Sequence, residues 1–164
     1  MNKTIIGIIV TILVLGGLVF IARPDAPSAP PVQANSNGTL AVEETSNYDF
    51  GAISMAAGKV KRAFKIKNTS NEAVVINKIY TSCMCTTATL INKGKQFGPY
   101  GMPGHAAIPK INQTVNPNEE TTVEVVFDPA AHGPAGVGKI QRTITIENNA
   151  GQPVELQFAA IVTP

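Results

Sequence analysis

Apolar residues recur at every second position in several stretches of this chain. In the first of them Val60, Phe64 and Ile66 share one face, and lysines take most of the alternate positions. Because successive side chains of a strand point to opposite faces, this period predicts strands that each bury one face. Stretches of the same kind are 74–79, 122–128, 140–147 and 154–162. No helical period follows residue 22, so the chain beyond it is predicted to be all-β.

Turn-forming residues separate the predicted strands. Asn, Pro, Asp, Ser and Gly gather at 68–71, 116–118, 128–129 and 148–151. These residue types favour turns because they accept special backbone angles or bond to their own backbone. Short amphipathic strands joined by frequent turns are typical of two packed sheets, so the sequence predicts a β-sandwich.

The N-terminus carries a different signal. An unbroken apolar run extends from Thr4 to Ala22, with Lys3 before it and Arg23 after it. A helix of this length, rising about 1.5 Å per residue, crosses the roughly 30 Å hydrocarbon core of a bilayer. The charge of Lys3 and of the amino terminus favours a cytoplasmic N-terminus. We therefore predict a single-pass protein of the cell membrane whose C-terminal domain is extracytoplasmic.

A cleaved signal peptide is the alternative for the same segment, since such peptides also begin with a basic region and an apolar stretch. Val32-Gln33-Ala34 has the small-residue spacing that a signal peptidase uses, and cleavage there would give a secreted domain. This site lies well past the apolar run and beyond several prolines. That distance favours an uncleaved anchor.

Three parts are predicted along the chain. Residues 1–22 form the membrane anchor or signal segment, residues 23–46 a spacer, and residues 47–164 the sandwich domain. The spacer is rich in Pro, Ala, Ser and Asn and has almost no large apolar residues, so it cannot bury a core. The formal net charge is only +2, and no cluster of Lys and Arg indicates a nucleic-acid partner.

Several short motifs occur in the order found in one bacterial family. They are Tyr48-Asp49-Phe50-Gly51, 64–69, Ser82-Cys83-Met84-Cys85-Thr86, Phe127-Asp128, Gly138-Lys139 and 146–149. On these motifs, residues 47–162 resemble the domain-of-unknown-function family 1573, whose members are similar to Hydin-type immunoglobulin-like domains. The resemblance implies an exported, immunoglobulin-like β-sandwich of seven or eight strands, with no established activity.

The sequence departs from the family pattern at three places. Met84 stands where the family usually has glycine, Asn118 replaces the glycine of a Pro-Gly-Glu turn, and an insert occupies about residues 90–113.

The insert is the predicted contact surface for a partner. It carries Phe97, Tyr100 and Met102 among glycines and prolines. Loops at the ends of a sandwich tolerate insertions and often carry binding sites, and exposed aromatic residues are frequent anchors of interfaces. We predict that these three side chains contact another protein of the cell envelope. The alternative is that the insert only covers an open end of the sandwich.

Cys83 and Cys85 are the only cysteines, and three hypotheses about them stay open. The favoured one is that both are buried, reduced thiols that pack at the end of a strand. A disulfide between them is the second hypothesis. In an extended strand their Cα atoms would lie roughly 6.5 Å apart, which is near the upper limit for such a bond.

The third hypothesis is a soft-metal site. Two thiolates at this spacing converge on one ion, and Cu(I) prefers thiolate and thioether ligands. Met102 and His105 of the insert would complete the site formed by Cys83 and Cys85, and Met84 and His132 are further candidate ligands. An extracytoplasmic copper-binding protein is therefore the alternative function. Without copper, no cofactor is predicted.

One stretch imitates a nucleotide site. Gly133 to Lys139 fits the first seven positions of a phosphate-binding loop, but Ile140 stands where Ser or Thr would hold magnesium. The residues after it alternate like a strand, whereas a phosphate loop opens a helix. We predict a glycine-rich turn and no nucleotide. Since no arrangement of catalytic residues is found either, the chain is predicted not to be an enzyme.

Overall fold

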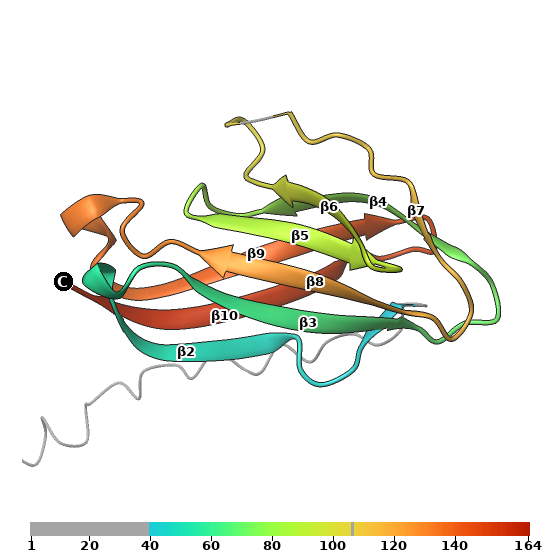
Figure 1. Ribbon diagram of the computed structural model, residues 1–164, viewed down its shortest axis with the longest axis horizontal. Coiled ribbons are helices and arrows are strands. Elements are labelled where there is room, and N and C mark those ends of the chain that lie inside the picture. The colour runs from blue at the N-terminus through green and yellow to red at the C-terminus, as the bar shows by residue number, and fades with distance from the viewer. Residues whose placement is uncertain (1–39, 106) are drawn as a thin grey trace, which may run out of the picture. The chain divides into compact units, whose positions relative to one another are not determined.

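The structure is a computed structural model that describes residues 40–105 and 107–164. Within these residues ten strands form two sheets of five, in the orders β1-β3-β8-β5-β6 and β2-β10-β9-β4-β7 (Figure 1). The strands are β1 (Leu40–Val42), β2 (Asn47–Ser54), β3 (Val60–Asn68), β4 (Val74–Thr81), β5 (Thr86–Asn92), β6 (Lys95–Tyr100), β7 (Gln113–Val115), β8 (Glu120–Phe127), β9 (Gly138–Asn148) and β10 (Val154–Thr163). Two short 3-10 helices, η1 (Met55–Ala57) and η2 (Gly133–Gly136), lie between strands.

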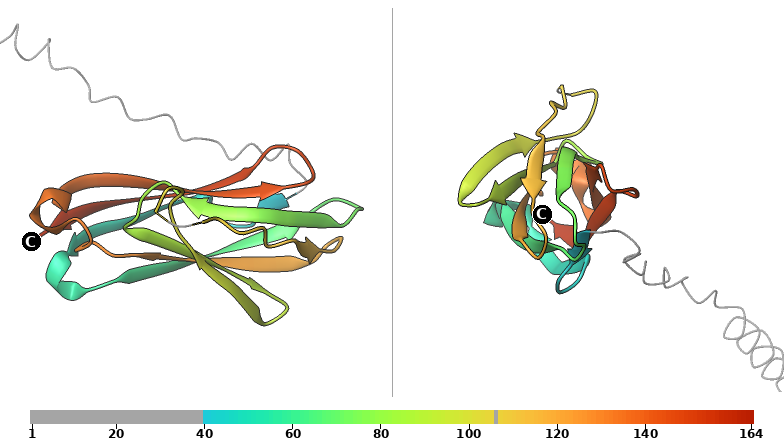
Figure 2. Two further views of the ribbon diagram at one scale, coloured as in Figure 1. Left: turned by 90° about the horizontal axis from the view of Figure 1, so that it is seen from above. Right: turned by 90° about the vertical axis from the view of Figure 1, so that its right-hand side faces the viewer.

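The two sheets pack face to face and enclose one apolar core (Figure 2). Both sheets contribute to it, and its largest fully buried side chains are Phe158, Ile66, Ile76, Ile79, Leu90, Ile144, Ile146, Leu156, Val74, Val115, Val123 and Val125. Neighbouring strands are antiparallel except β2 and β10, which run parallel. The prediction of an all-β sandwich is confirmed.

The predicted alternation decides which residues enter this core. In β3, Phe64 and Ile66 are buried while Lys61 and Lys65 are exposed. In β4, Ile76 and Ile79 are both buried although three positions apart, because the pairing with β9 shifts register between Ile76 and Lys78. The bulge restores the inward direction that strict alternation would have lost.

The strand count implied by the family resemblance, seven or eight, is too low for the described residues. Three of the ten strands are short or lie in segments without clear alternation: β1, β6 and β7. Each forms the edge of a sheet, where a strand needs only one buried partner. Such short edge strands leave little periodic signal in a sequence.

The predicted start of the domain at residue 47 is also wrong. Strand β1 lies inside the predicted spacer and pairs with β3, with Leu40 opposite Asn68 and Val42 opposite Ile66. The Leu40 side chain is buried in the core. A strand of three residues is too short to reveal its period, so composition alone assigned it to the spacer.

The insert at 90–113 belongs mostly to the sandwich. Leu90 is a buried residue of β5, and the following hairpin strand β6 places Phe97 opposite Leu90 and Tyr100 opposite Ala88. Beyond β6 the chain crosses to the other sheet and bonds to β4 at two points. Thr81 N donates to Gly101 O, and Ile111 N donates to Asn77 O. The insert thus supplies an edge strand to one sheet and bonds to β4 of the other sheet at both ends of its crossing.

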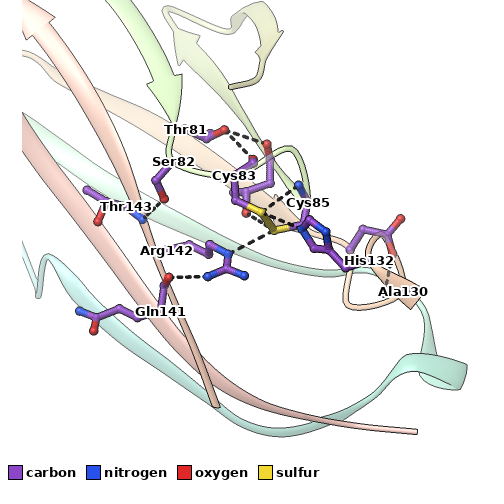
Figure 3. Close-up of a disulfide and its surroundings, with 11 residues drawn as sticks. Thr81, Ser82, Cys83, Cys85, Ala130, His132, Gln141, Arg142 and Thr143 are labelled. Carbon is purple, nitrogen blue, oxygen red and sulfur yellow. Dashed lines mark hydrogen bonds between the residues drawn. A yellow bond between two sulfur atoms is a disulfide. The ribbon is translucent and has the colours of Figure 1, made fainter. Parts of the chain in front are cut away.

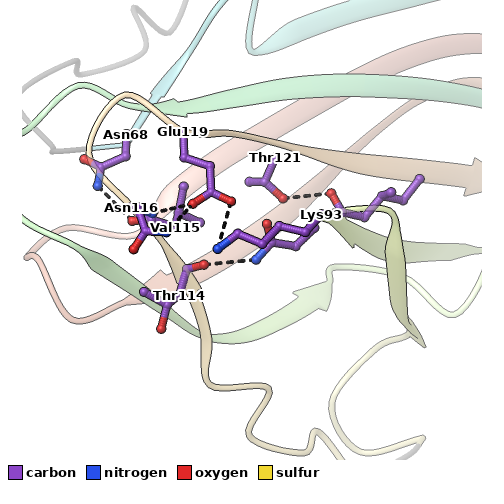
Figure 4. Close-up of polar contacts among 9 residues, drawn as sticks. Asn68, Lys93, Thr114, Val115, Asn116, Glu119 and Thr121 are labelled. Atoms are coloured by element: carbon purple, nitrogen blue, oxygen red, sulfur yellow. Dashed lines mark hydrogen bonds and ion pairs between the residues drawn. The ribbon is translucent and has the colours of Figure 1, made fainter.

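Polar groups fix the turn between β7 and β8 (Figure 4). Glu119 N donates to Asn116 O at 3.0 Å, and Asn118 takes a positive φ of 61° between them. The Glu119 carboxylate accepts from the backbone N and the side-chain Nδ2 of Asn116 at 2.9 and 2.8 Å and pairs with Lys93 Nζ at 3.3 Å. Asn tolerates the left-handed conformation better than most residues, which explains why it can replace glycine here.

In the described part of the chain, no helix is long and apolar enough to cross a membrane. The predicted anchor, residues 4–22, and the predicted cleavage site at Val32-Gln33-Ala34 lie outside the described residues.

Candidate functional site

The two cysteines lie in the turn that joins the two sheets between β4 and β5. Thr86 N donates to Cys83 O at 3.1 Å and closes this turn. The Thr81 hydroxyl lies 3.0 Å from Cys83 O and 3.1 Å from Thr86 O, within donating distance of both. Because Thr81 and Thr86 are buried, these contacts satisfy backbone groups that would otherwise be costly to bury.

Cys83 and Cys85 form a disulfide (Figure 3). Their Cα atoms are 5.3 Å apart, which is shorter than the distance expected for an extended strand and lies within the usual range for a disulfide. The favoured prediction of two reduced, packed thiols is therefore wrong, although the prediction that both residues are buried is confirmed. The reason is local: residues 83–85 turn instead of extending.

Two basic side chains contact the two sulfurs. Arg142 Nε donates to Cys85 Sγ at 3.3 Å, and His132 Nε2 lies 3.2 Å from Cys83 Sγ (Figure 3). A disulfide sulfur carries no hydrogen, so the second contact is a hydrogen bond when Nε2 of His132 is protonated. The guanidinium is held in turn by a hydrogen bond from Arg142 Nη1 to Gln141 O at 2.8 Å. Each sulfur thus lies beside its own side-chain nitrogen.

Three separate segments meet at this site. The cysteine turn is tied to β9, since Ser82 N donates to Thr143 O and Ser82 Oγ accepts from Thr143 N, both at 2.9 Å. It is tied to the chain after β8 by the bond from Asp128 N to Cys85 O, also 2.9 Å. From there, consecutive turns lead to His132, which directly precedes η2. The surrounding sheets therefore hold both basic residues against the disulfide.

The predicted copper ligands are only partly brought together. Among the described His, Cys, Asp and Glu residues, one group could hold a metal ion: Cys83, Cys85 and His132, with ligand atoms within 4.8 Å of one another. His105 is not in this group. It lies in the insert, where its backbone N donates to Met102 O at 3.3 Å. The imidazole at the site therefore belongs to His132, in the loop after β8. The prediction had placed the imidazole of His105, from the insert, at this position.

The predicted partner contacts in the insert are largely covered. Tyr100 is buried, and this burial raises the pKa of its phenol. Phe97 is half-buried and packs against the core, and Met102 is half-buried as well. The prediction that Tyr100 is exposed for a partner is wrong, because the β5–β6 hairpin turns it inward opposite Ala88.

The large apolar side chains that stay exposed in the described residues lie elsewhere. They are Met84 at 51%, Val137 at 45% and Ile161 at 46% exposure. Met84 lies between the two cysteines, and Val137 follows η2 directly. Ile161 lies on β10 opposite Lys139, close to the start of β9. All three are thus at the end of the sandwich that carries the disulfide.

The stretch that imitates a phosphate loop is part of the same end. Its first four residues form η2, and Gly138 begins β9, so no long helix follows it. Gly133 and Gly138 take positive φ values of 56° and 120°, as expected for a glycine-rich turn.

Arg142 was not predicted as a site residue, although the sequence contains a sign of its role. Ile140, Arg142, Ile144 and Ile146 occupy alternate positions of β9 and therefore share the face that points to the core. Arg142 pairs with Phe158, whose side chain is buried. An arginine on an inward-facing position needs a partner, because burying an unpaired charge is costly. The inward position of Arg142 therefore indicates a residue with a specific partner.

Part of the chain is similar to one known protein family. Residues 40–98 match the sequence model of the family DUF1573, described as protein of unknown function. This match confirms the resemblance for the motifs up to Thr86, whereas the motifs at 127–128, 138–139 and 146–149 lie beyond the matched residues. It includes Cys83 and Cys85, whereas His132 and Arg142 lie beyond the matched residues. No protein of curated function matches the chain.

Solved structures share the fold at low sequence identity. A protein of unknown function from Porphyromonas gingivalis W83 aligns with a TM-score of 0.55 and 16% identity, over 82% of this chain and 51% of that one. This chain therefore spans about half of that protein's length. A family 123 glycoside hydrolase from Clostridium perfringens aligns with a TM-score of 0.50 and 6% identity, over 73% of this chain and 23% of that one. At these identities the likeness concerns the fold alone.

Proposed function

We propose that this chain is a membrane-anchored, extracytoplasmic immunoglobulin-like module that binds another protein of the cell envelope and is not an enzyme. The observation that carries the proposal is the Cys83–Cys85 disulfide. Disulfides persist in the oxidising spaces outside the cytoplasm and are rare inside it. The apolar run from Thr4 to Ala22 supports the same location, since it is long enough to hold the domain at the membrane.

The partner contact is assigned to the end of the sandwich that carries the disulfide. Met84, Val137 and Ile161 keep about half of their surface exposed there, although large apolar side chains normally gain free energy by burial. Exposed apolar residues at one end of a domain are typical of a protein-binding surface. The insert, by contrast, uses its aromatic residues for the domain itself.

A reporter fusion tests the location. Alkaline phosphatase fused after Pro164 should be active in a bacterial host, because that enzyme folds only outside the cytoplasm. Deleting residues 1–22 from the same fusion serves as the control and should abolish the activity. A full-length fusion that is inactive as a phosphatase would refute the proposed location.

Binding is tested separately by photo-crosslinking in cells of the native host. A crosslinking amino acid at Met84 or Val137 should give a discrete adduct with an envelope protein. The same amino acid at Glu155, which is exposed at the start of β10, is the control and should not give this adduct. Equal adducts from all three positions would contradict the assigned surface.

A second candidate function, Cu(I) binding, is favoured by the group of Cys83, Cys85 and His132. Reduction of the disulfide would free two thiolates beside one imidazole, a donor set that suits Cu(I). Under reducing conditions the full chain would retain one copper per chain after dialysis, and His132→Ala would weaken retention while His105→Ala would not. Loss of all copper on dialysis of the wild-type chain would remove this candidate.

A further inference from the structure

We infer that Cys83 and Cys85 are a reversible dithiol–disulfide pair that exchanges with a dithiol of the partner protein. The inference rests on the proposed function, because it assigns chemistry to the same partner-binding end. Four observations support it: the disulfide itself, the unequal exposure of its two residues, the guanidinium that donates to one sulfur, and the exposed residues around the pair.

The two cysteines are not equivalent toward an incoming thiolate. Cys83 is 7% exposed and Cys85 only 3%. Cys83 also borders His132 and Met84, both of which are exposed at the surface. Because the exposed His132 lies beside Cys83, an incoming thiolate reaches Cys83 from that surface, and Cys83 is the sulfur that is attacked.

Cys85 is the natural leaving group. Thiol–disulfide exchange is faster when the departing thiolate is stabilised. Arg142 Nε donates to Cys85 Sγ, and a hydrogen bond from a cationic donor strengthens when the acceptor gains negative charge. The hydrogen bond from Arg142 Nη1 to Gln141 O keeps the guanidinium in place before the reaction begins.

The reaction proceeds in two steps. In the first, a thiolate of the partner attacks Cys83 Sγ, the bond between the two cysteines breaks, and its electron pair goes to Cys85 Sγ beside Arg142. In the second, the other thiolate of the partner attacks the partner's own sulfur in the mixed disulfide and releases Cys83 as a thiolate beside His132. The partner dithiol is oxidised by two electrons to a disulfide, and the two protons it gives up pass to Cys83 and Cys85.

The first test measures how fast dithiothreitol, a small dithiol, reduces the disulfide of the full chain purified in detergent. Samples are quenched with acid and alkylated, and the labels are counted by mass spectrometry. Arg142→Gln should slow reduction about tenfold, because the leaving thiolate loses a charged hydrogen bond. Arg62→Gln is the matched control, because Arg62 is also a half-buried arginine but pairs with Glu44 and stacks on Tyr48 instead of donating to a sulfur.

Arg142→Gln reduced as fast as Arg62→Gln would overturn the role of the guanidinium. If Arg142→Gln does not fold, Arg142→Lys replaces it, since it keeps the charge without the planar donor and should slow the reaction by a smaller factor. A wild-type disulfide that reacts only after the domain is unfolded would overturn the whole inference.

The second test identifies the attacked sulfur. The intact disulfide of the wild-type chain is treated with reduced glutathione, a monothiol, and the mixed disulfide is trapped with acid and alkylation. Fragmentation in the mass spectrometer should place glutathione mainly on Cys83 and the alkyl label on Cys85, because the attacked sulfur keeps the incoming thiol and the leaving sulfur becomes free. Glutathione found equally on both cysteines, or mainly on Cys85, would contradict the assignment. These tests use purified protein, so their failure leaves the location measured by the phosphatase fusion unaffected.

Discussion

The side chain of Asn68, at the end of β3, has no exposed surface, yet each of its polar atoms has a partner. Its Nδ2 donates to Glu72 O at 2.7 Å and to Val115 O at 2.9 Å. Its Oδ1 accepts from the backbone N and the hydroxyl of Ser70 at 3.0 and 2.7 Å. One residue thereby fixes the β3–β4 turn and ties it to β7. This structural role accounts for Asn68 in one of the motifs that carry the family resemblance.

We predict that Asn68→Ala lowers the free energy of unfolding by about 2 kcal/mol, because the buried Val115 O loses its side-chain donor and the turn loses its link to β7. Asn71→Ala, at an exposed position in the same turn, is the control and should change it by less than about 0.5 kcal/mol. Urea unfolding of the two variants makes the comparison. Similar midpoints would show that the Asn68 network does not hold the turn.

Glu119 links stability to pH. The backbone N–H of Asn116 holds the pKa of its carboxyl below the usual value, and Lys93 acts in the same direction. A pKa that is lower in the folded than in the unfolded chain stabilises the fold above the unfolded value, and this contribution disappears as the pH falls through the folded value.

Glu119→Gln should therefore destabilise the domain at pH 7 by roughly 0.5–1 kcal/mol, as expected for an exposed turn. The difference from wild type should shrink in acid, once the wild-type carboxyl is protonated. Urea midpoints across the acid range give the answer, and a difference that is the same at all pH values would contradict the assignment.

At the scale of elements, the β5–β6 hairpin depends on close backbone packing at Gly98. Its φ of 120° is unfavourable for other residues, and a Cβ there would lie 3.0 Å from Ala88 O and 3.1 Å from the Tyr100 ring. Gly98→Ala should cost about 1–3 kcal/mol, because both the backbone and β6 must shift. Gly101→Ala is the matched control, since its φ is unexceptional and no atom lies within 4 Å of its Cβ. Thermal unfolding that ranks Gly101→Ala as the worse variant would contradict this account of the hairpin.

The elements predicted well from the sequence are those in the middle of the sheets. Strands β3, β8, β9 and β10 each bury one face along eight or more residues, so the period of two is clear. Strands β1 and β7 have three residues each and show no period. Tyr100 was misassigned for a related reason: glycines and prolines around it suggested a loop, whereas its pairing with Ala88 depends on a contact between strands.

The site was predictable only in part, because it is assembled from segments far apart in the chain. Cys83 and Cys85 are recognisable as a pair, but their state depends on whether residues 83–85 extend or turn. His132 reaches Cys83 across 49 positions and Arg142 reaches Cys85 across 57. Local sequence patterns contain no information on such contacts. Only the inward position of Arg142 on β9 gave a local sign that it needed a partner.

For the whole molecule, two observations from different parts of the chain concern its location. The apolar run from Thr4 to Ala22 predicts a route out of the cytoplasm, and the disulfide in the described domain fits an oxidising space. If the domain lies outside the membrane, the disulfide persists in living cells. If the domain lies in the cytoplasm, the two thiols are kept reduced.

The number of free thiols in living cells distinguishes these two locations. Cells that express the full chain are divided into two samples, and one sample is first exposed to a reductant that does not cross the membrane. Both samples are then quenched in acid, denatured and treated with a maleimide mass tag. The account predicts no tag on the directly quenched chain and two tags after the reductant, since Cys83 and Cys85 are its only cysteines. A variant with both cysteines replaced by alanine controls for other sites of tagging. Two tags on the directly quenched wild-type chain would contradict the account.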